Sequence, residues 1–158
     1  IFAEKIFHEG ADTYSHLMAF SGAGSIVGAL IVAWLGKFPK MGWTALLVQA
    51  AYGVLIIAFS VSRVLWLSDM LLFFTGAALM VVFSTITSLV QLIAPNEMRG
   101  RVMSIYMIAF RGGMPLGSLV SGWLATFFGA PMVIGINGAL LVVVAVYFLT
   151  RNHGVLDT

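Results

Sequence analysis

Five long apolar runs, separated by short polar breaks, fill almost the whole sequence. They cover residues 13–35, 42–61, 66–93, 103–127 and 131–150. A membrane-spanning helix needs about 20 predominantly apolar residues, so each run is long enough to cross a bilayer. The breaks contain glycine, proline or charged residues, which are typical of turns. The pattern therefore predicts an all-α, polytopic membrane helix bundle, with five transmembrane helices in a single domain of residues 1–158.

Composition strengthens this prediction and narrows the function. Hydrophobic residues make up 61% of the 158 residues, and charged residues only 9%. Soluble domains carry about a quarter charged residues, so a water-soluble enzyme, a disordered tail and a nucleic-acid module are excluded. The net charge of +2 gives no sign of a nucleic-acid partner, and the absence of cysteine removes disulfides, thiolate metal sites and cysteine nucleophiles. The sequence predicts no metal and no cofactor.

Basic residues lie unevenly on the two sides of the predicted bundle. If successive helices alternate in direction, Lys37, Lys40, Arg99, Arg101 and Arg151 share one side, whereas Lys5 and Arg63 share the other. Lysine and arginine are retained on the cytoplasmic side, so the C-terminus is predicted to be cytoplasmic. The chain starts at Ile1 with a charged segment outside the membrane, and we expect it to be a fragment of a longer protein.

A shift of 89 residues superposes the first predicted helix on the fourth and the second on the fifth. The identities are Gly24 with Gly113, Gly28 with Gly117, Leu30 with Leu119, Trp34 with Trp123, Leu35 with Leu124, and Phe38 with Phe127. Related helices then have opposite orientations, as in the inverted triplet repeats of secondary transporters. The helix at 66–93 has no counterpart, so one helix is predicted just upstream of Ile1, completing a six-helix half.

Small residues recur on the first and fourth helices. The fourth carries Gly113, Pro115, Gly117 and Gly122, and the first carries Ser21, Gly24, Ser25 and Gly28. Small faces let helix backbones approach closely, and proline opens the hydrogen-bond ladder. Two interpretations of the fourth helix remain open: plain packing, or a bend that moves during transport.

Arg111 is the most informative charge. It lies ten residues beyond Arg101, or about 15 Å along a helix, and therefore within the hydrocarbon. An arginine at this depth is costly and is a functional-site candidate, although it could also reach the cytoplasmic face or cap carbonyls of a broken helix. No carboxylate in the spans offers an obvious partner. The partner would come from absent sequence or from an anionic substrate.

Two further polar groups are candidates. The third helix carries Thr75, Ser84, Thr85 and Ser88, hydroxyls that either bond their own helix or line a cavity. In the segment Pro95–Arg101, Pro95 is expected to stop the third helix, Gly100 to form a tight turn, and Glu97 to pair with Arg99 or Arg101. This segment either holds helix ends together or acts as a gate latch. Nothing matches a phosphate-binding loop, a metal-ligand set or a catalytic triad.

The residues at 90–104, including Pro95-Asn96-Glu97-Met98-Arg99-Gly100-Arg101, followed by Gly113-Met114-Pro115-Leu116-Gly117-Ser118, resemble those of major facilitator superfamily transporters. The similarity is greatest to the branch of the enterobactin exporter and the macrolide efflux proteins. It covers essentially the whole chain as helices eight to twelve. The chain would then be a partial C-terminal half of a twelve-helix transporter.

This resemblance implies proton-driven export of a small molecule by alternating access, in a multi-pass protein of the bacterial inner membrane. The implied pathway is formed by Thr75, Ser84, Thr85 and Ser88, with Arg111, Ser21 and Ser25 beside it. The family's acidic residue is missing from residues 29–36, so a charge-relay gate with Lys37 and Lys40 is doubtful. Proton-handling carboxylates are expected in the absent N-terminal half, which would be a partner together with the lipid bilayer and the substrate.

A different class remains as the alternative: a non-transporting membrane scaffold or an intramembrane enzyme. An enzyme would need paired acids, a histidine cluster or a nucleophile with a base inside the bilayer. The sequence offers none of these in its apolar runs.

Overall fold

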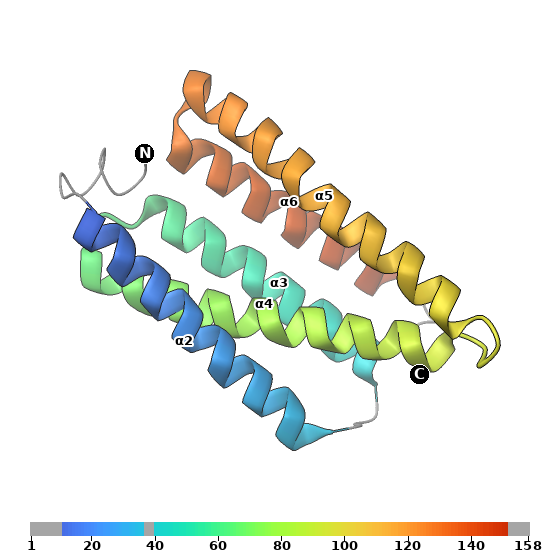
Figure 1. The fold of residues 1–158 in the computed structure, drawn as a ribbon. Coiled ribbons are helices and arrows are strands. Elements are labelled where there is room, and N and C mark those ends of the chain that lie inside the picture. The colour runs from blue at the N-terminus through green and yellow to red at the C-terminus, as the bar shows by residue number, and fades with distance from the viewer. Residues whose placement is uncertain (1–10, 37–39, 152–158) are drawn as a thin grey trace.

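The computed structural model describes residues 11–36 and 40–151, and these residues form five α-helices (Figure 1). The helices are α2 (Ala11–Leu35), α3 (Met41–Val61), α4 (Leu65–Ile93), α5 (Arg99–Phe128) and α6 (Ala130–Arg151). No strand occurs in the described residues. The all-helical prediction is confirmed, and the predicted runs match the helices closely at every end except the start of α5.

The start of α5 differs from the prediction because the polar turn after α4 is shorter than expected. Pro95 disfavours a helical conformation in the residue before it, and Ala94 is extended, with φ −68° and ψ 126°. The chain turns through Asn96–Met98, where the Met98 N–H donates to the Pro95 carbonyl at 3.0 Å. Gly100 therefore lies inside α5, and the predicted tight turn at Gly100 is wrong.

Two glycines allow sharp turns at other helix ends. Gly36 follows α2 with φ 59°, and Gly129 separates α5 from α6 with φ 83°. These left-handed values suit a residue without a Cβ atom. The connections are short, so consecutive helices run in opposite directions.

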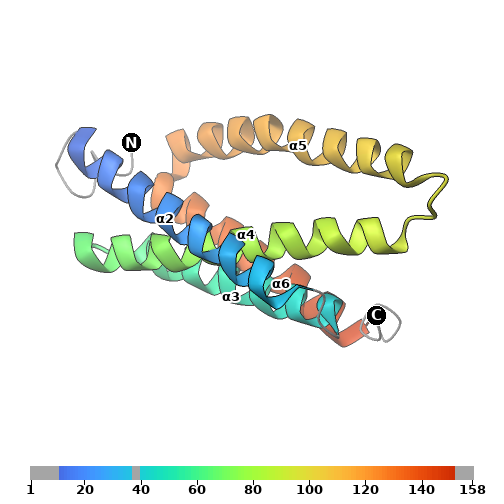
Figure 2. The same cartoon turned by 60° about the horizontal axis from the view of Figure 1, so that its bottom comes forward.

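The helices pack pairwise in the order α5, α6, α3, α4, α2 (Figure 1). Helix α4 packs against both α2 and α3, and α3 also packs against α6. Helix α5 lies mainly on α6 and touches α4 only slightly. Figures 1 and 2 show α2 and α5 running in opposite directions, the relation that an inverted repeat requires. The repeat itself stays a prediction.

Glycines bring the helix backbones together at two crossings. A Cβ atom at Gly24 or Gly28 would collide with the backbone of Phe73 or Ala77 on α4. At the crossing of α3 and α6, a Cβ atom on Gly53 would lie 2.8 Å from the Gly138 carbonyl oxygen, and the reciprocal distance is also 2.8 Å. Small residues therefore define both crossings, as is usual where lipid removes the hydrophobic drive for helix association.

Most apolar side chains point outward rather than into a core. The buried hydrophobic cluster is small: Leu17 and Phe59 pack with Leu65, Leu71, Leu72 and Ile134. Trp34, Trp66 and many leucine, isoleucine and valine side chains are exposed. An apolar exterior of this kind is the expected surface of a protein whose solvent is lipid.

Four of the five helices are long and apolar enough to cross a membrane: α2 from Thr13, α3, α4 and α6. Helix α5 has 30 residues but is less apolar, because Arg111, Pro115 and several glycines interrupt it. That α5 also crosses the membrane stays a prediction.

We expect Gly24→Ala to destabilise the protein by about 1–3 kcal/mol, the usual cost of overpacking a tight contact. The added methyl group would meet the Phe73 carbonyl and push α2 away from α4. The measurement is the free energy of unfolding in mixed detergent micelles. Gly22→Ala is the matched control, because a Cβ atom at Gly22 has no neighbour within 4 Å. Equal stabilities of the two variants would contradict the backbone contact.

Candidate transport pathway

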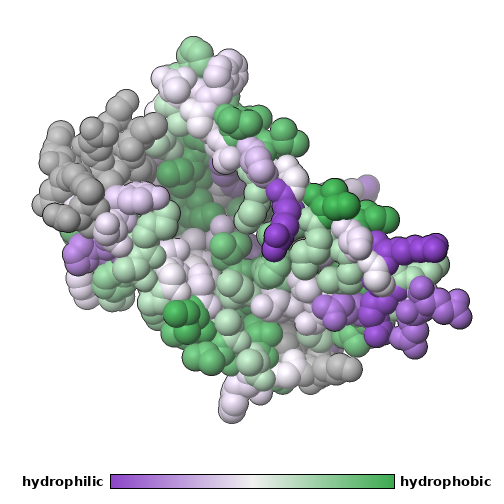
Figure 3. Space-filling model, viewed as in Figure 1, coloured by the Kyte–Doolittle hydropathy of each residue, from purple (hydrophilic) through white to green (hydrophobic). Residues whose placement is uncertain are grey.

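Arg111 lies near the middle of α5. It comes twelve residues after the first residue of the helix, Arg99, which corresponds to about 18 Å along the axis. Its side chain is exposed and makes no hydrogen bond or ion pair with any residue that the structure describes. Figure 3 shows a strongly hydrophilic group part-way along α5, between apolar atoms, away from the hydrophilic cluster at the start of this helix. A cation without a partner is therefore presented at mid-helix.

The backbone next to Arg111 is also unusual. Pro115 has no N–H, so the carbonyl of Arg111 cannot accept the ordinary helical hydrogen bond from the residue four positions later. The Pro115 carbonyl itself accepts a hydrogen bond from Ser118 Oγ at 2.9 Å. Arg111 thus offers both a guanidinium donor and a carbonyl acceptor in the same turn.

The glycines of α5 contact no neighbouring helix, whereas those of α2 pack against α4. No atom lies within 4 Å of a Cβ built on Gly113, Gly117 or Gly122, and α5 contains no buried residue. Gly24 and Gly28, which the 89-residue shift equates with Gly113 and Gly117, are packed tightly on α4. The glycine face of α2 is therefore packed against another helix, whereas the face of α5 that the predicted repeat makes equivalent to it has no helix against it.

The hydroxyl groups of α4 are used in three different ways. Thr75 Oγ1 donates to the Leu71 carbonyl of its own helix at 2.6 Å, so its hydrogen-bonding capacity is partly used. Thr85 is fully buried, and its Oγ1 has no partner. Ser84 and Ser88 are half-buried and lie one turn apart on one face. Of the four candidates, only Ser84 and Ser88 combine a partly exposed hydroxyl with the absence of any hydrogen bond to another described residue.

Ser21 and Ser25 lie at the crossing of α2 and α4. Ser25 Oγ lies 2.9 Å from the Ser21 carbonyl and 3.3 Å from the Gly76 carbonyl of α4. The structure thus brings Ser21 and Ser25 next to Gly76 of α4, but not next to Arg111. Helices α2 and α5 lie on opposite sides of α3 and α4 (Figure 1).

Aromatic side chains that the sequence analysis did not single out connect α5 with α4. The rings of Phe83 and Phe110 have centroids 4.9 Å apart, and Thr87 Oγ1 lies 3.4 Å from the Tyr106 hydroxyl. Phe110 precedes Arg111, so this contact positions the arginine relative to α4. The sequence contains many aromatic residues within its apolar runs, and their spacing does not indicate which two rings will pack together.

The Pro95–Arg101 segment is held by an amide rather than by the predicted ion pair. Arg99 Nη2 donates to Asn96 Oδ1 at 2.7 Å. Within residues 94–101, Glu97 pairs with neither Arg99 nor Arg101, so the expected pairing is not formed. All three charged side chains are exposed. Lys40 is exposed at the start of α3, and Lys37 lies outside the described residues.

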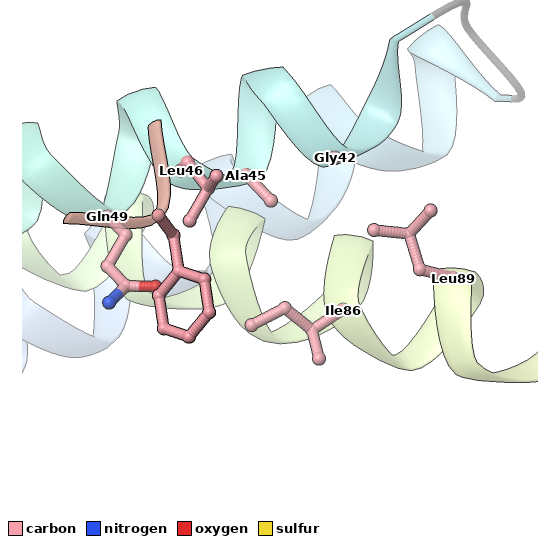
Figure 4. A pocket seen from close by; sticks show the side chains of 7 residues that line it. Gly42, Ala45, Leu46, Gln49, Ile86 and Leu89 are labelled. Atoms are coloured by element: carbon pink, nitrogen blue, oxygen red, sulfur yellow. The ribbon is translucent and has the colours of Figure 1, made fainter. Parts of the chain in front are cut away.

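An apolar cavity of about 210 Å³ lies between α3, α4 and α6. Figure 4 shows Leu46 and Gln49 of α3 across from Ile86 and Leu89 of α4, with the Gln49 amide as the polar group of the wall. Gly42, Ala45 and Phe148 complete the lining. The cavity can accept an apolar group, but none of the predicted pathway residues lines it.

One carboxylate within a span, Asp69, is not among the predicted site residues. Asp69 belongs to α4 and is only 7% exposed. It forms no ion pair with Arg111 in the described structure, in agreement with the expectation that no carboxylate in the spans is an obvious partner for this arginine. The sequence did offer a way to find Asp69, because it is the one acidic residue of six that lies within an apolar run.

The comparison with protein families decides the identity. The MFS_3 family model, described as transmembrane secretion effector, matches residues 1–156. The chain belongs to the MFS_3 family. It is therefore an integral membrane protein of the major facilitator type, whose function is membrane transport. The comparison with curated proteins found no match, and the comparison with solved structures found none either.

A double-mutant cycle tests the α4–α5 contact of this MFS_3 protein. We expect Phe83→Ala and Phe110→Ala to show a coupling energy of about 0.5–1.5 kcal/mol, because the two rings pack together. The measurement is the unfolding free energy of the single and double variants. In the control cycle, Phe74→Ala replaces Phe83→Ala; the Phe74 ring packs on Phe73, so additive effects are expected. Additivity in both cycles would show that α5 is not held by this contact.

Proposed function

We propose that the protein is the C-terminal part of a secondary transporter that exports a small molecule across the bacterial inner membrane. Transport proceeds by alternating access and is driven by protons entering in exchange. The family match over residues 1–156 supports transport in general. The resemblance of Pro95–Arg101 and Gly113–Ser118 to exporters of the enterobactin and macrolide branch supports the direction and the class of substrate.

The exposed and unpaired side chain of Arg111 is the observation that supports a transport pathway along α5. An unpaired guanidinium at mid-helix is costly in hydrocarbon and therefore needs water or an anion beside it. We assign to Arg111 the binding of an anionic group of the substrate. Ser84 and Ser88 supply hydroxyls from α4, and the Phe83–Phe110 contact keeps the two helices together.

The N-terminal half that the twelve-helix architecture requires would supply the other wall of the pathway. The open glycine face of α5 agrees with this arrangement, because Gly113 and Gly117 have no neighbour within 4 Å. A flexing of α5 at Pro115 would change the width of the pathway during the cycle.

Replacement of Arg111 tests the proposed site. In cells producing the full-length protein, we expect Arg111→Ala to lower export of an anionic substrate about tenfold, the effect of losing ~1.4 kcal/mol of binding. Membrane levels should stay normal. Arg111→Lys should retain part of the activity, because it keeps the charge but loses the planar donor fork.

Arg151→Ala is the matched control for this experiment. Arg151 lies at the end of α6, where its guanidinium donates to the Tyr147 hydroxyl at 2.9 Å. This variant should export normally. If Arg111→Ala also exports at the wild-type rate, the assigned role of Arg111 is refuted.

Reporter fusions test the proposed orientation. Lys40, Arg99, Arg101 and Arg151 lie at one end of the helices and Arg63 at the other, so the positive-inside rule puts the first group in the cytoplasm. We expect green fluorescent protein fused after Arg151 to fluoresce, and alkaline phosphatase fused after Arg63 to be active. The opposite pair of results would reverse the orientation.

A further inference from the structure

The apolar cavity between α3, α4 and α6 is separate from the proposed pathway. Helix α3 packs against both α4 and α6, and residues of these three helices form the walls of the cavity. Arg111, Ser84 and Ser88 are not among the lining residues. A molecule bound in this cavity therefore contacts surfaces that the proposed substrate does not touch.

The shape of the cavity follows from the side chains that α3 presents to it. Four lining residues of α3 share one face of the helix, because they are spaced i, i+3, i+4 and i+7: Gly42, Ala45, Leu46 and Gln49. Ile86 and Leu89 of α4 lie across from this face (Figure 4). Gly42 and Ala45 are small and leave space between the helices. The volume of about 210 Å³ exceeds that of an apolar cavity that takes up benzene, ~150 Å³, so one ring with a small substituent has room here.

Gln49 is the one polar side chain among the lining residues. It is half-buried, and its amide makes no hydrogen bond to any residue that the structure describes. A side-chain amide offers two N–H donors and a carbonyl acceptor, and leaving them without partners in an apolar environment is costly. Gln49 therefore favours a ligand that brings a polar atom into the cavity.

Neither water nor a lipid acyl chain matches this lining. A bound water needs about two to four polar partners, whereas the lining offers a single polar side chain. An acyl chain suits the apolar walls but leaves the Gln49 amide without a partner. A molecule that has both an apolar body and a hydroxyl or carbonyl group satisfies the walls and the amide together.

We propose that this cavity binds an uncharged amphipathic small molecule, with a ring-sized apolar body and a hydroxyl or carbonyl group that hydrogen-bonds to the Gln49 amide. The body packs against Leu46, Ile86 and Phe148. No charged residue lines the cavity, which disfavours an ionic ligand. The three helices are all long and apolar enough to cross a membrane, so the ligand reaches the cavity from the bilayer. The proposal does not depend on the proposed function, because it concerns a site outside the pathway.

The test uses the full-length protein in lipid nanodiscs and two photoreactive probes, meta-azidobenzyl alcohol and meta-azidotoluene. The probes are alike except that the second lacks the hydroxyl group. After irradiation, mass spectrometry of the peptides locates the label. The alcohol is expected to label the segments Ala45–Gln49 and Ile86–Leu89 saturably. At equal concentrations in the bilayer, the toluene should bind about three- to tenfold more weakly, because it makes no hydrogen bond with Gln49.

Three variants distinguish the cavity from general uptake into lipid. Ala45→Phe places a ring in the cavity and should abolish saturable labelling. Leu47→Phe is the matched control, because it places a ring on the exposed side of the same helix, and labelling should be unchanged. Gln49→Leu keeps a side chain of similar size but removes the amide, so the two probes should bind it equally.

Absence of saturable labelling at these segments of the wild-type protein would overturn the proposal, as would equal saturable labelling of wild-type protein and Ala45→Phe. Equal binding of the two probes to the wild-type protein would also refute it, since the cavity would then be a purely apolar groove suited to an acyl chain. If Ala45→Phe does not fold, the comparison of the two probes on Gln49→Leu decides the question. None of these outcomes depends on whether the protein transports a substrate.

Discussion

A bilayer core contains no water, and this constraint governs the whole structure. Backbone groups must be satisfied within each helix, and apolar side chains gain nothing by leaving lipid for another helix. Helices therefore associate where their backbones can touch. The contacts of Gly24 and Gly28 with α4, and of Gly53 with Gly138, are such places. They explain a bundle that holds together with a very small buried hydrophobic cluster.

The absence of water in the bilayer core also makes polar side chains within the helices informative, because each of them needs a hydrogen-bond partner. Hydroxyl groups such as those of Thr75 and Thr87 bond carbonyls of their own helix and need nothing else. The side chains of Arg111 and Asp69 make no such hydrogen bond within their own helices. One is exposed at mid-helix and the other is buried near a helix end, and each lacks a partner in the described chain. Both are therefore polar groups that no other described residue satisfies.

The sequence predicted the helices well because hydropathy and length alone determine them in a membrane protein. It misplaced the start of α5, since charged residues at 99–101 looked like a loop although the turn needs only Asn96–Met98. The candidate site was less predictable. Which face of α4 meets Ser25, and which ring meets Phe110, depends on how the helices cross, and similar apolar side chains do not encode that choice. Asp69 was missed because an acid near the end of a run resembles an interfacial residue, and only its burial distinguishes it.

The central claim is that α5 crosses the membrane with Arg111 beside water. The chain itself has no cysteine, so once any cysteine elsewhere in the full-length protein is replaced by serine, single cysteines can be placed along Val102–Phe127 and tested with a water-soluble thiol reagent. The account predicts reactivity at the two ends of α5 and on the one face that includes Arg111, with the remaining faces protected by lipid. Uniform reactivity along α5, or complete protection around Arg111, would contradict it.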